Sequence, residues 1–166
     1  MRAAPQSSLR YQTLLQLLRT ADTIWDASRA FFAPWNLGPS QFNVLNLLYG
    51  LPNGLSQTEV GRKLIMHRSN ITGLVDRLEK RGLVERKGLP GDRRVCRVVL
   101  TSQGTRVIEE VLPMYYRKAE ELWGDCSAKV LTELNSRLNQ AARIAARVAQ
   151  ENDLPEKERY ENQNRE

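Results

Sequence analysis

The chain has 166 residues, of which 41% are hydrophobic and 27% charged, with a formal net charge of +6 and a pI near 9.6. This length and composition indicate a soluble globular protein with one or at most two small domains. No apolar run approaches the roughly 18 residues of a membrane span, and the N-terminus lacks the apolar centre of a signal peptide, so we expect a cytoplasmic protein.

The first third of the chain predicts two helices. Apolar residues recur at helical spacing from Leu9 to about Phe32, and Pro34 ends this stripe. Pro39 suits the first position of a second helix, where its missing N–H is not needed, and Gln41 follows two residues later. A cluster of helix breakers at residues 50–54 ends the second helix.

The next segment predicts a helix, a turn and another helix. Ser56 and Glu59 have the spacing of a capping box, so a short third helix begins there and is expected to end near Ile65. A fourth, basic helix is predicted from about Arg68 to Arg81, with Gly82 as its left-handed cap.

A basic hairpin follows these helices. Two β-like runs, Leu83–Lys87 and Val95–Leu100, flank the turn residues Gly88, Pro90 and Gly91. This order indicates a winged helix-turn-helix, which presents one helix to the major groove of DNA. Between residues 62 and 97, eleven basic and four acidic side chains leave a charge of +7 out of a total of +6, so the positive charge is concentrated on this unit. Such a concentration is typical of a protein that binds a polyanion.

The last part of the chain predicts two long helices. Thr101 suits the N-cap of a fifth helix that reaches about Trp123, and Pro113 predicts a kink or a break in it near residues 111–112. A sixth helix is predicted over Ser127–Gln150. The first, fifth and sixth helices carry more apolar surface than a small winged domain can cover, so a second copy of the chain is the simplest partner.

We therefore expect a mainly α protein with six helices and a small β-wing. Residues 37–104 would form the winged helix-turn-helix DNA-binding domain, and residues 1–36 and 105–151 the dimerisation helices. The polar, aperiodic residues 152–166 would form a disordered tail.

Three segments resemble the MarR family of winged-helix transcriptional regulators. Asp92-Arg93-Arg94 with Leu100-Thr101 and Gly104 resembles the family's wing signature, D-x-R followed by L-T-x-x-G. Residues 74–84 are similar to the recognition helix and first wing strand, and residues 41–45 to the opening of the second helix. The resemblance implies a dimer on a pseudo-palindromic operator, which many members release on binding a small phenolic or aromatic ligand and others on oxidation. His67 departs from the Ser or Thr that usually caps the recognition helix, and histidine is a poorer cap.

The candidate DNA-binding residues lie on the two central helices and the wing tip. Arg68 can pair with guanine and Asn70 with adenine, whereas Ser69 and Asn70 can also cap the helix or contact phosphate. Arg77 is a phosphate contact or a partner of Asp76 or Glu79. A carboxylate at the wing tip can fix one guanidinium while the other projects, and the resemblance makes Arg94 the minor-groove or structural arginine. The full set is Ser56, Gln57, Lys63, His67, Arg68, Ser69, Asn70, Thr72, Arg77, Asp92, Arg93 and Arg94.

Aromatic residues near the predicted seam between the dimerisation helices and the winged domain are candidates for an effector site. A crevice lined by such side chains suits a small aromatic ligand, although large aromatics more often pack a core or a dimer contact. The candidates are Trp25, Phe31, Trp35, Tyr49, Met66 and His67.

Cys96, Cys126 and the lone His67 lack the spacing of a disulfide framework, a zinc site or a catalytic pair, so we expect no metal, no cofactor and no enzyme activity. Alternation along the second wing strand places Cys96 on the face of Val98 and Leu100, which predicts a buried thiol, and Cys126 is expected to be partly buried. The leading hypothesis is a dimeric repressor released from DNA by a small aromatic ligand. The alternatives are a regulator of the same fold without an effector, and a thiol-based redox sensor.

Overall fold

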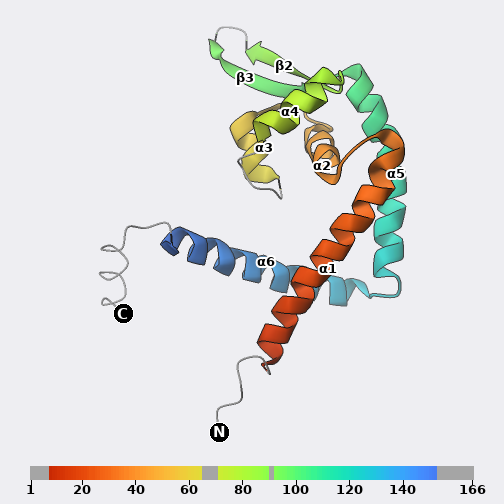
Figure 1. The fold of residues 1–166 in the computed structure, drawn as a ribbon, viewed down its shortest axis with the longest axis vertical. Coiled ribbons are helices and arrows are strands. Elements are labelled where there is room, and N and C mark those ends of the chain that lie inside the picture. Colours follow the sequence, from red (N-terminus) through yellow and green to blue (C-terminus); the bar gives the residue numbers. More distant parts are fainter. Residues whose placement is uncertain (1–7, 65–70, 90–91, 153–166) are drawn as a thin grey trace. The chain divides into compact units, whose positions relative to one another are not determined.

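The computed structural model describes residues 8–64, 71–89 and 92–152, with the backbone alone at residues 89, 92–95 and 150–152. Two compact units divide the chain, residues 1–116 and 117–166, and the fifth helix crosses from the first into the second. The elements in chain order are α1 (Leu9–Phe32), the 3-10 turn η2 (Ala33–Trp35), α2 (Pro39–Leu48), β1 (Leu55–Ser56), α3 (Gln57–Lys63), α4 (Ile71–Lys80), β2 (Val84–Leu89), β3 (Asp92–Leu100), α5 (Ser102–Trp123) and α6 (Ala128–Asn152) (Figure 1).

Local signals place most helix starts where the sequence predicts them. α1 has the predicted bounds, and α2 begins at Pro39 with the Gln41 side chain accepting the Gly38 N–H at 2.9 Å. α6 begins one residue after Ser127, whose hydroxyl accepts the Val130 N–H at 3.4 Å. α3 ends at Lys63, slightly before the expected end, and the predicted start of the fourth helix lies outside the described residues. The predicted tail over residues 152–166 also lies outside them, apart from the backbone of residue 152.

The sheet is a hairpin with one short added strand. β3 lies between β1 and β2 and pairs antiparallel with both, with Val84 opposite Leu100 and Leu55 opposite Val98. The sequence reading missed β1 because two residues are too short for an alternating pattern. The sheet is therefore three-stranded among the described residues.

One hydrophobic core holds the winged part together. Phe32 at the end of α1 is almost fully buried against the core residues of α2, α3, α4, the strands and the first half of α5. The largest fully buried side chains include Phe32, Phe42, Leu45, Leu48, Leu74, Leu78, Leu83 and Ile108, and the smaller Val60 of α3 and Val84 of β2 are also fully buried. The core thus fixes α4 and the hairpin relative to each other within the first unit.

The prediction of buried thiols is wrong, because both Cys96 and Cys126 are exposed in this single chain. Cys96 pairs with Gly88 toward the tip of the hairpin, beyond the part of β3 that reaches the core. Val99 is buried as well as Val98, although simple alternation puts them on opposite faces. The segment before β1 covers the second face, where Gly54 lies against both residues.

Of the kink or break predicted near residues 111–112, the break is wrong. α5 runs without interruption from Ser102 to Trp123 with Pro113 inside it. Pro113 and Glu109, whose carbonyl loses its usual helical donor, are both exposed, so water can satisfy that carbonyl. None of the described helices is long and apolar enough to cross a membrane.

Candidate nucleic-acid interface

The capping box predicted at the start of α3 is confirmed. The Ser56 hydroxyl accepts the Glu59 N–H at 3.2 Å, while the Glu59 carboxylate accepts the Ser56 N–H and the Ser56 hydroxyl, both at 2.8 Å. The bond from the Ser56 N–H, and to a smaller extent the bond from the Ser56 hydroxyl, hold the pKa of Glu59 below its ordinary value. The geometry fixes the helix start, and it engages the Ser56 hydroxyl within the chain.

α3 and α4 pack closely enough to form the two arms of a helix-turn-helix. Gly61 is buried, and a Cβ added there would lie 3.3 Å from Cγ1 of Ile71. α4 turns an apolar face to the core with Ile71, Leu74, Val75 and Leu78 buried. Its other side presents exposed Thr72, Arg77 and Lys80 to solvent. An amphipathic helix with exposed cations in this position matches the arrangement of a recognition helix.

The predicted DNA-binding residues are only partly described. Lys63, Thr72 and Arg77 are exposed, whereas the Gln57 side-chain nitrogen is buried and has no hydrogen-bond partner among the described residues. The backbone of Asp92, Arg93 and Arg94 begins β3, but their side chains are not described. His67, Arg68, Ser69 and Asn70 lie outside the described residues, as does the effector candidate Met66.

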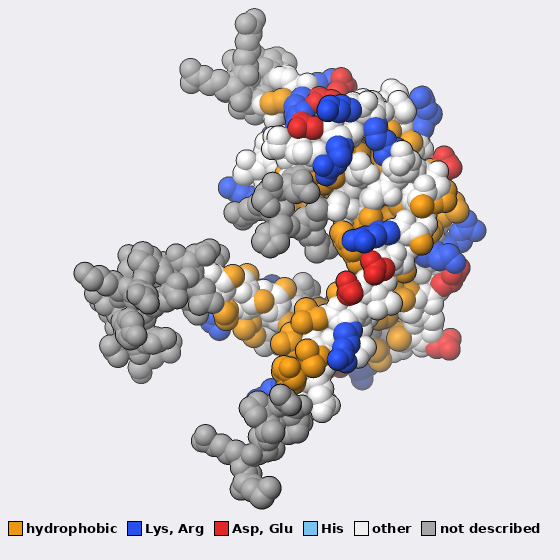
Figure 2. Space-filling view, in the orientation of Figure 1, with side chains coloured by type: hydrophobic (Ala, Val, Ile, Leu, Met, Phe, Trp, Pro, Cys, Tyr) orange, Lys and Arg blue, Asp and Glu red, His pale blue; other side chains and the backbone are white. Residues whose placement is uncertain are grey.

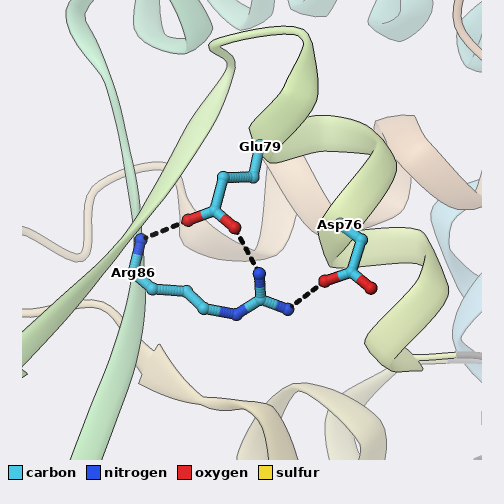
Figure 3. Close-up of polar contacts among 3 residues, drawn as sticks. All are labelled: Asp76, Glu79 and Arg86. Carbon is cyan, nitrogen blue, oxygen red and sulfur yellow. Dashed lines mark hydrogen bonds and ion pairs between the residues drawn. The ribbon is translucent and has the colours of Figure 1, made fainter.

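Asp76 and Glu79 pair with an arginine that the sequence reading did not select. The Arg86 guanidinium binds the Asp76 carboxylate at 2.5 Å and also the Glu79 carboxylate, and the Arg86 N–H donates to Glu79 at 3.0 Å (Figure 3). Arg77 makes no ion pair with either carboxylate in the described structure, so the alternative that Arg77 partners Asp76 or Glu79 is not supported. The spacing of the two acids on one face of α4 was a visible signal, but their partner depends on how β2 folds back beside the helix.

The base of the wing is tied to the start of α5 by the residues of the L-T-x-x-G signature. The Thr101 hydroxyl donates to the Gly82 carbonyl at 2.6 Å and accepts the Gly104 N–H at 3.0 Å, and the Thr101 N–H donates to Leu83 at 3.2 Å. Gly82 has φ of +67°, which confirms it as the left-handed cap after α4. Gly104 allows α5 to approach the Leu83 backbone, because a Cβ there would lie 1.9 Å from the Leu83 oxygen.

The predicted effector residues do not line one pocket. Phe31 lies 5.7 Å from Trp35 and 6.0 Å from Tyr115 between ring centroids, in a cluster that also packs Phe32 and Phe42. These rings adjoin the core, so packing explains them. Tyr115, which the sequence reading did not select, lies at the centre of the cluster because α5 returns beside α1 and α2, a contact that no local pattern reveals.

Tyr49 lies in a different place. It helps line a shallow depression of about 240 Å³ with Leu51, Val99 and Thr105. Its hydroxyl donates to the Glu109 carboxylate at 3.4 Å, and the negative charge of Glu109 raises the pKa of Tyr49. Trp25 is half-buried on α1 and joins no ring pair in the described part of the chain.

Trp35 links three elements. Its indole N–H donates to the Glu110 carboxylate of α5 at 2.9 Å, and its carbonyl accepts from the Arg81 guanidinium at 3.0 Å. Arg81 also donates to the Asn36 carbonyl at 2.5 Å. The residue after α4 is therefore fastened to the turn between α1 and α2.

The arrangement of α3, α4 and the hairpin agrees with the sequence similarity of this chain to known regulators. Residues 35–95 match the model of the MarR family. The HTH-type transcriptional regulator PapX of Escherichia coli is 32% identical over 123 residues, which cover 73% of this chain and 75% of that protein. This chain belongs to the MarR family. It is a winged-helix DNA-binding transcriptional regulator, and the family comprises regulators and not enzymes.

The chain is also similar to two other proteins whose names indicate a role or a ligand. The transcriptional repressor MprA of Escherichia coli K12 is 33% identical over 95 residues, which cover 53% of this chain and 54% of that protein. CouR from Rhodococcus jostii RHA1, whose crystal structure contains p-coumaroyl-CoA, is 26% identical in sequence to this chain. The two structures superpose with a TM-score of 0.73 over 82% of this chain and 95% of that chain.

Proposed function

We propose that this MarR-family protein is a homodimeric repressor that binds a pseudo-palindromic operator and leaves it on binding a small aromatic ligand. α4 reads the major groove and the wing tip contacts the adjacent backbone or minor groove. The observation that carries this proposal is the exposed face of α4, where Thr72, Arg77 and Lys80 lie opposite a fully buried apolar face.

The dimer is supported by apolar side chains that a single chain leaves in water. Leu18 of α1 is 58% exposed and Tyr116 of α5 is 59% exposed, and Leu14, Leu122 and Val130 are also exposed. Hydrophobic side chains show at the surface over α1 and over α6 (Figure 2). Exposed apolar surface on long helices is typical of an oligomeric contact. On this proposal, residues 1–36 and 105–151 supply the dimer contact and residues 37–104 the DNA-binding domain.

A substitution on α1 tests the dimer. Leu18→Glu places a charge in the proposed contact and should shift the protein from dimer to monomer in sedimentation analysis at micromolar concentration. Gln12→Glu adds a charge at an exposed position of α1 about 120° around the helix from Leu18, away from the apolar face, so it is the matched control and should remain dimeric. A wild-type protein that sediments as a monomer would contradict the proposed dimer.

The proposals that the protein is a repressor and that it binds an aromatic ligand are supported by its relatives and by aromatic residues at the C-terminal end of α1. MprA is named a transcriptional repressor, and CouR was crystallised with p-coumaroyl-CoA, an aromatic acyl thioester. In this chain, Phe31 and Trp35 are only partly buried and lie beside the hydrogen bond to Glu110. A flat aromatic ligand has ring surface to contact there.

Selection of bound duplexes from a random pool tests the whole proposal. We expect an enriched sequence with two half-sites about one helical turn apart, and affinity that falls steeply with salt. Hydroxycinnamic and salicylic acids and their coenzyme A thioesters are then added to the complex, and release by at least one of them is expected. Enrichment of no sequence would contradict operator binding, and enrichment without release would favour the regulator without an effector.

The exposed thiols give the redox alternative one supporting observation, because burial does not protect Cys96 or Cys126 in the single chain. Peroxide treatment of the operator complex is therefore a separate arm. If peroxide releases the wild-type protein from the operator but does not release Cys96→Ser or Cys126→Ser, a thiol sensor would be favoured.

A further inference from the structure

Arg86 fastens the wing to the recognition helix. Its side chain is 25% exposed and belongs to β2, yet its ion pairs within the described residues all reach α4. The guanidinium binds Asp76 and Glu79, and the backbone N–H of the same residue donates to Glu79 at 3.0 Å (Figure 3). Side-chain and main-chain bonds of one residue therefore meet two carboxylates of one helix.

The residue types suit this arrangement. Asp76 and Glu79 are three residues apart, which places both on the same side of a helix. A planar guanidinium offers several N–H groups in a fixed fork and can bind two carboxylates at once, whereas a lysine ammonium is a single point of charge. Burial alone lowers the pKa of Arg86, but the hydrogen bonds to Asp76 and Glu79 outweigh it and the pKa is raised, so the charge persists.

The same contacts settle which cations on α4 remain available to DNA. Asp76 lies four residues before Lys80, so these two side chains are neighbours on the surface of the helix. Arg77 and Lys80 are exposed and make no ion pair within the described residues. Without their ion pairs to Arg86, both carboxylates would repel phosphate, and Asp76 would compete with DNA for Lys80.

We propose that Arg86 is a positioning residue for DNA recognition, which holds the wing against α4 and keeps Asp76 from capturing Lys80. Arg86 itself does not contact DNA. The inference rests on the proposed function, in which α4 and the wing bind the operator. It predicts two separable effects of losing Arg86, a loss of operator preference and a loss of general affinity for duplex DNA.

Three variants separate these effects. Arg86→Gln removes the positive charge and leaves both carboxylates without their ion pair to residue 86, although the backbone N–H of residue 86 can still donate to Glu79. The triple variant Arg86→Gln, Asp76→Asn, Glu79→Gln removes the carboxylates as well. Lys87→Gln is the matched control, because Lys87 is the next residue, is exposed and pairs only with Glu85 in the described structure. Each protein is titrated with the selected operator and with a random duplex over a range of salt concentrations, well below its melting temperature.

We expect Arg86→Gln to bind the operator at least tenfold more weakly and to lose about one unit of salt slope on either duplex, since a cation of α4 is captured. The triple variant should recover random-duplex affinity and the salt slope while operator binding stays at least tenfold weaker, since the ion pairs that join β2 to α4 are absent. Lys87→Gln should keep the operator preference. If Arg86→Gln does not fold, the triple variant, which leaves no unpaired carboxylate, carries the comparison alone.

Two results would overturn the inference. Operator binding within threefold of wild type in both Arg86 variants would leave Arg86 a stabilising residue only. A salt slope that stays lowered by about one unit in the triple variant would make Arg86 a direct phosphate contact. A wild-type protein that binds the operator no better than a random duplex would instead contradict the proposed function. The wild-type titration detects this outcome separately.

Discussion

Position 104 has room for a hydrogen atom only, so Gly104→Ala should destabilise the protein. A Cβ added there would lie 1.9 Å from the Leu83 carbonyl oxygen, 2.9 Å from its carbonyl carbon and 3.2 Å from Leu100. The nearest atoms belong to the backbone and cannot rotate away. The first turn of α5 must therefore move by about 1 Å or more to reach an ordinary contact distance.

The size of the effect follows from opposing contributions. Overpacking costs about 1–3 kcal/mol, and a clash with backbone belongs at the upper end of that range. The movement also weakens the bond from the Thr101 N–H to Leu83, which is 3.2 Å long and contributes about 1 kcal/mol. Alanine regains up to about 1 kcal/mol of helix propensity over glycine. The net loss is about 3 kcal/mol, which corresponds to a melting temperature lower by about 6–12 °C for a chain of this size.

Thermal unfolding followed by circular dichroism at one fixed protein concentration measures this loss, since the stability of an oligomer depends on concentration. Gly88→Ala is the control, because a Cβ at that position meets no atom within 4 Å. It should change the free energy of unfolding by less than about 0.5 kcal/mol. A Gly104→Ala protein as stable as the wild type would show that helix propensity outweighs the clash, and the account of the L-T-x-x-G contact would be refuted.

Three other substitutions have defined outcomes. The lowered pKa of Glu59 means that its carboxylate stabilises the fold above the unfolded-state pKa and that this contribution is lost as pH falls through the folded-state pKa. Glu59→Gln should therefore unfold at a lower urea concentration than the wild type at pH 7, and the two urea midpoints should converge in acid. Arg77→Gln should reduce the salt slope of operator binding by about one unit and weaken all duplexes alike, and a loss confined to one base pair would contradict a phosphate contact. Arg81→Gln removes the guanidinium bonds to the Trp35 and Asn36 carbonyls and should cost about 1–3 kcal/mol in thermal unfolding, while an unchanged melting temperature would show those bonds to be replaceable by water.

The helices were predictable because their ends depend on neighbouring residues. The Ser56–Glu59 capping box, Pro39 at the start of α2 and Gly82 after α4 each act within four residues of chain, and each is found in the structure. The failures share the opposite property. The thiol of Cys96 is exposed because the core does not extend along β3 to that position, and alternation along one strand carries no information on where the core stops.

The interactions that shape the candidate site were less predictable than the elements that carry it. Arg86 meets Asp76 across ten positions and Trp35 meets Glu110 across seventy-five, so both depend on how the elements pack. A charged residue has many possible partners at such sequence separations, so the sequence alone does not identify the partner that it meets. Among the predicted base-reading and wing-tip residues, only Thr72 has a described side chain, and the roles of all of them are still predictions.

The proposed ligand response and DNA binding share one physical link. Arg81 joins the end of α4 to the Trp35 and Asn36 carbonyls, and the Trp35 indole is bonded to Glu110 of α5. A ligand whose ring replaced Trp35 beside Phe31 would have to break these bonds, each worth about 1–3 kcal/mol where a charge takes part. Coupling between sites typically amounts to 1–3 kcal/mol, so two such bonds are enough to carry it. Arg81→Gln should therefore weaken ligand-induced release more than operator affinity, because Arg86 still holds α4 to the wing in this variant.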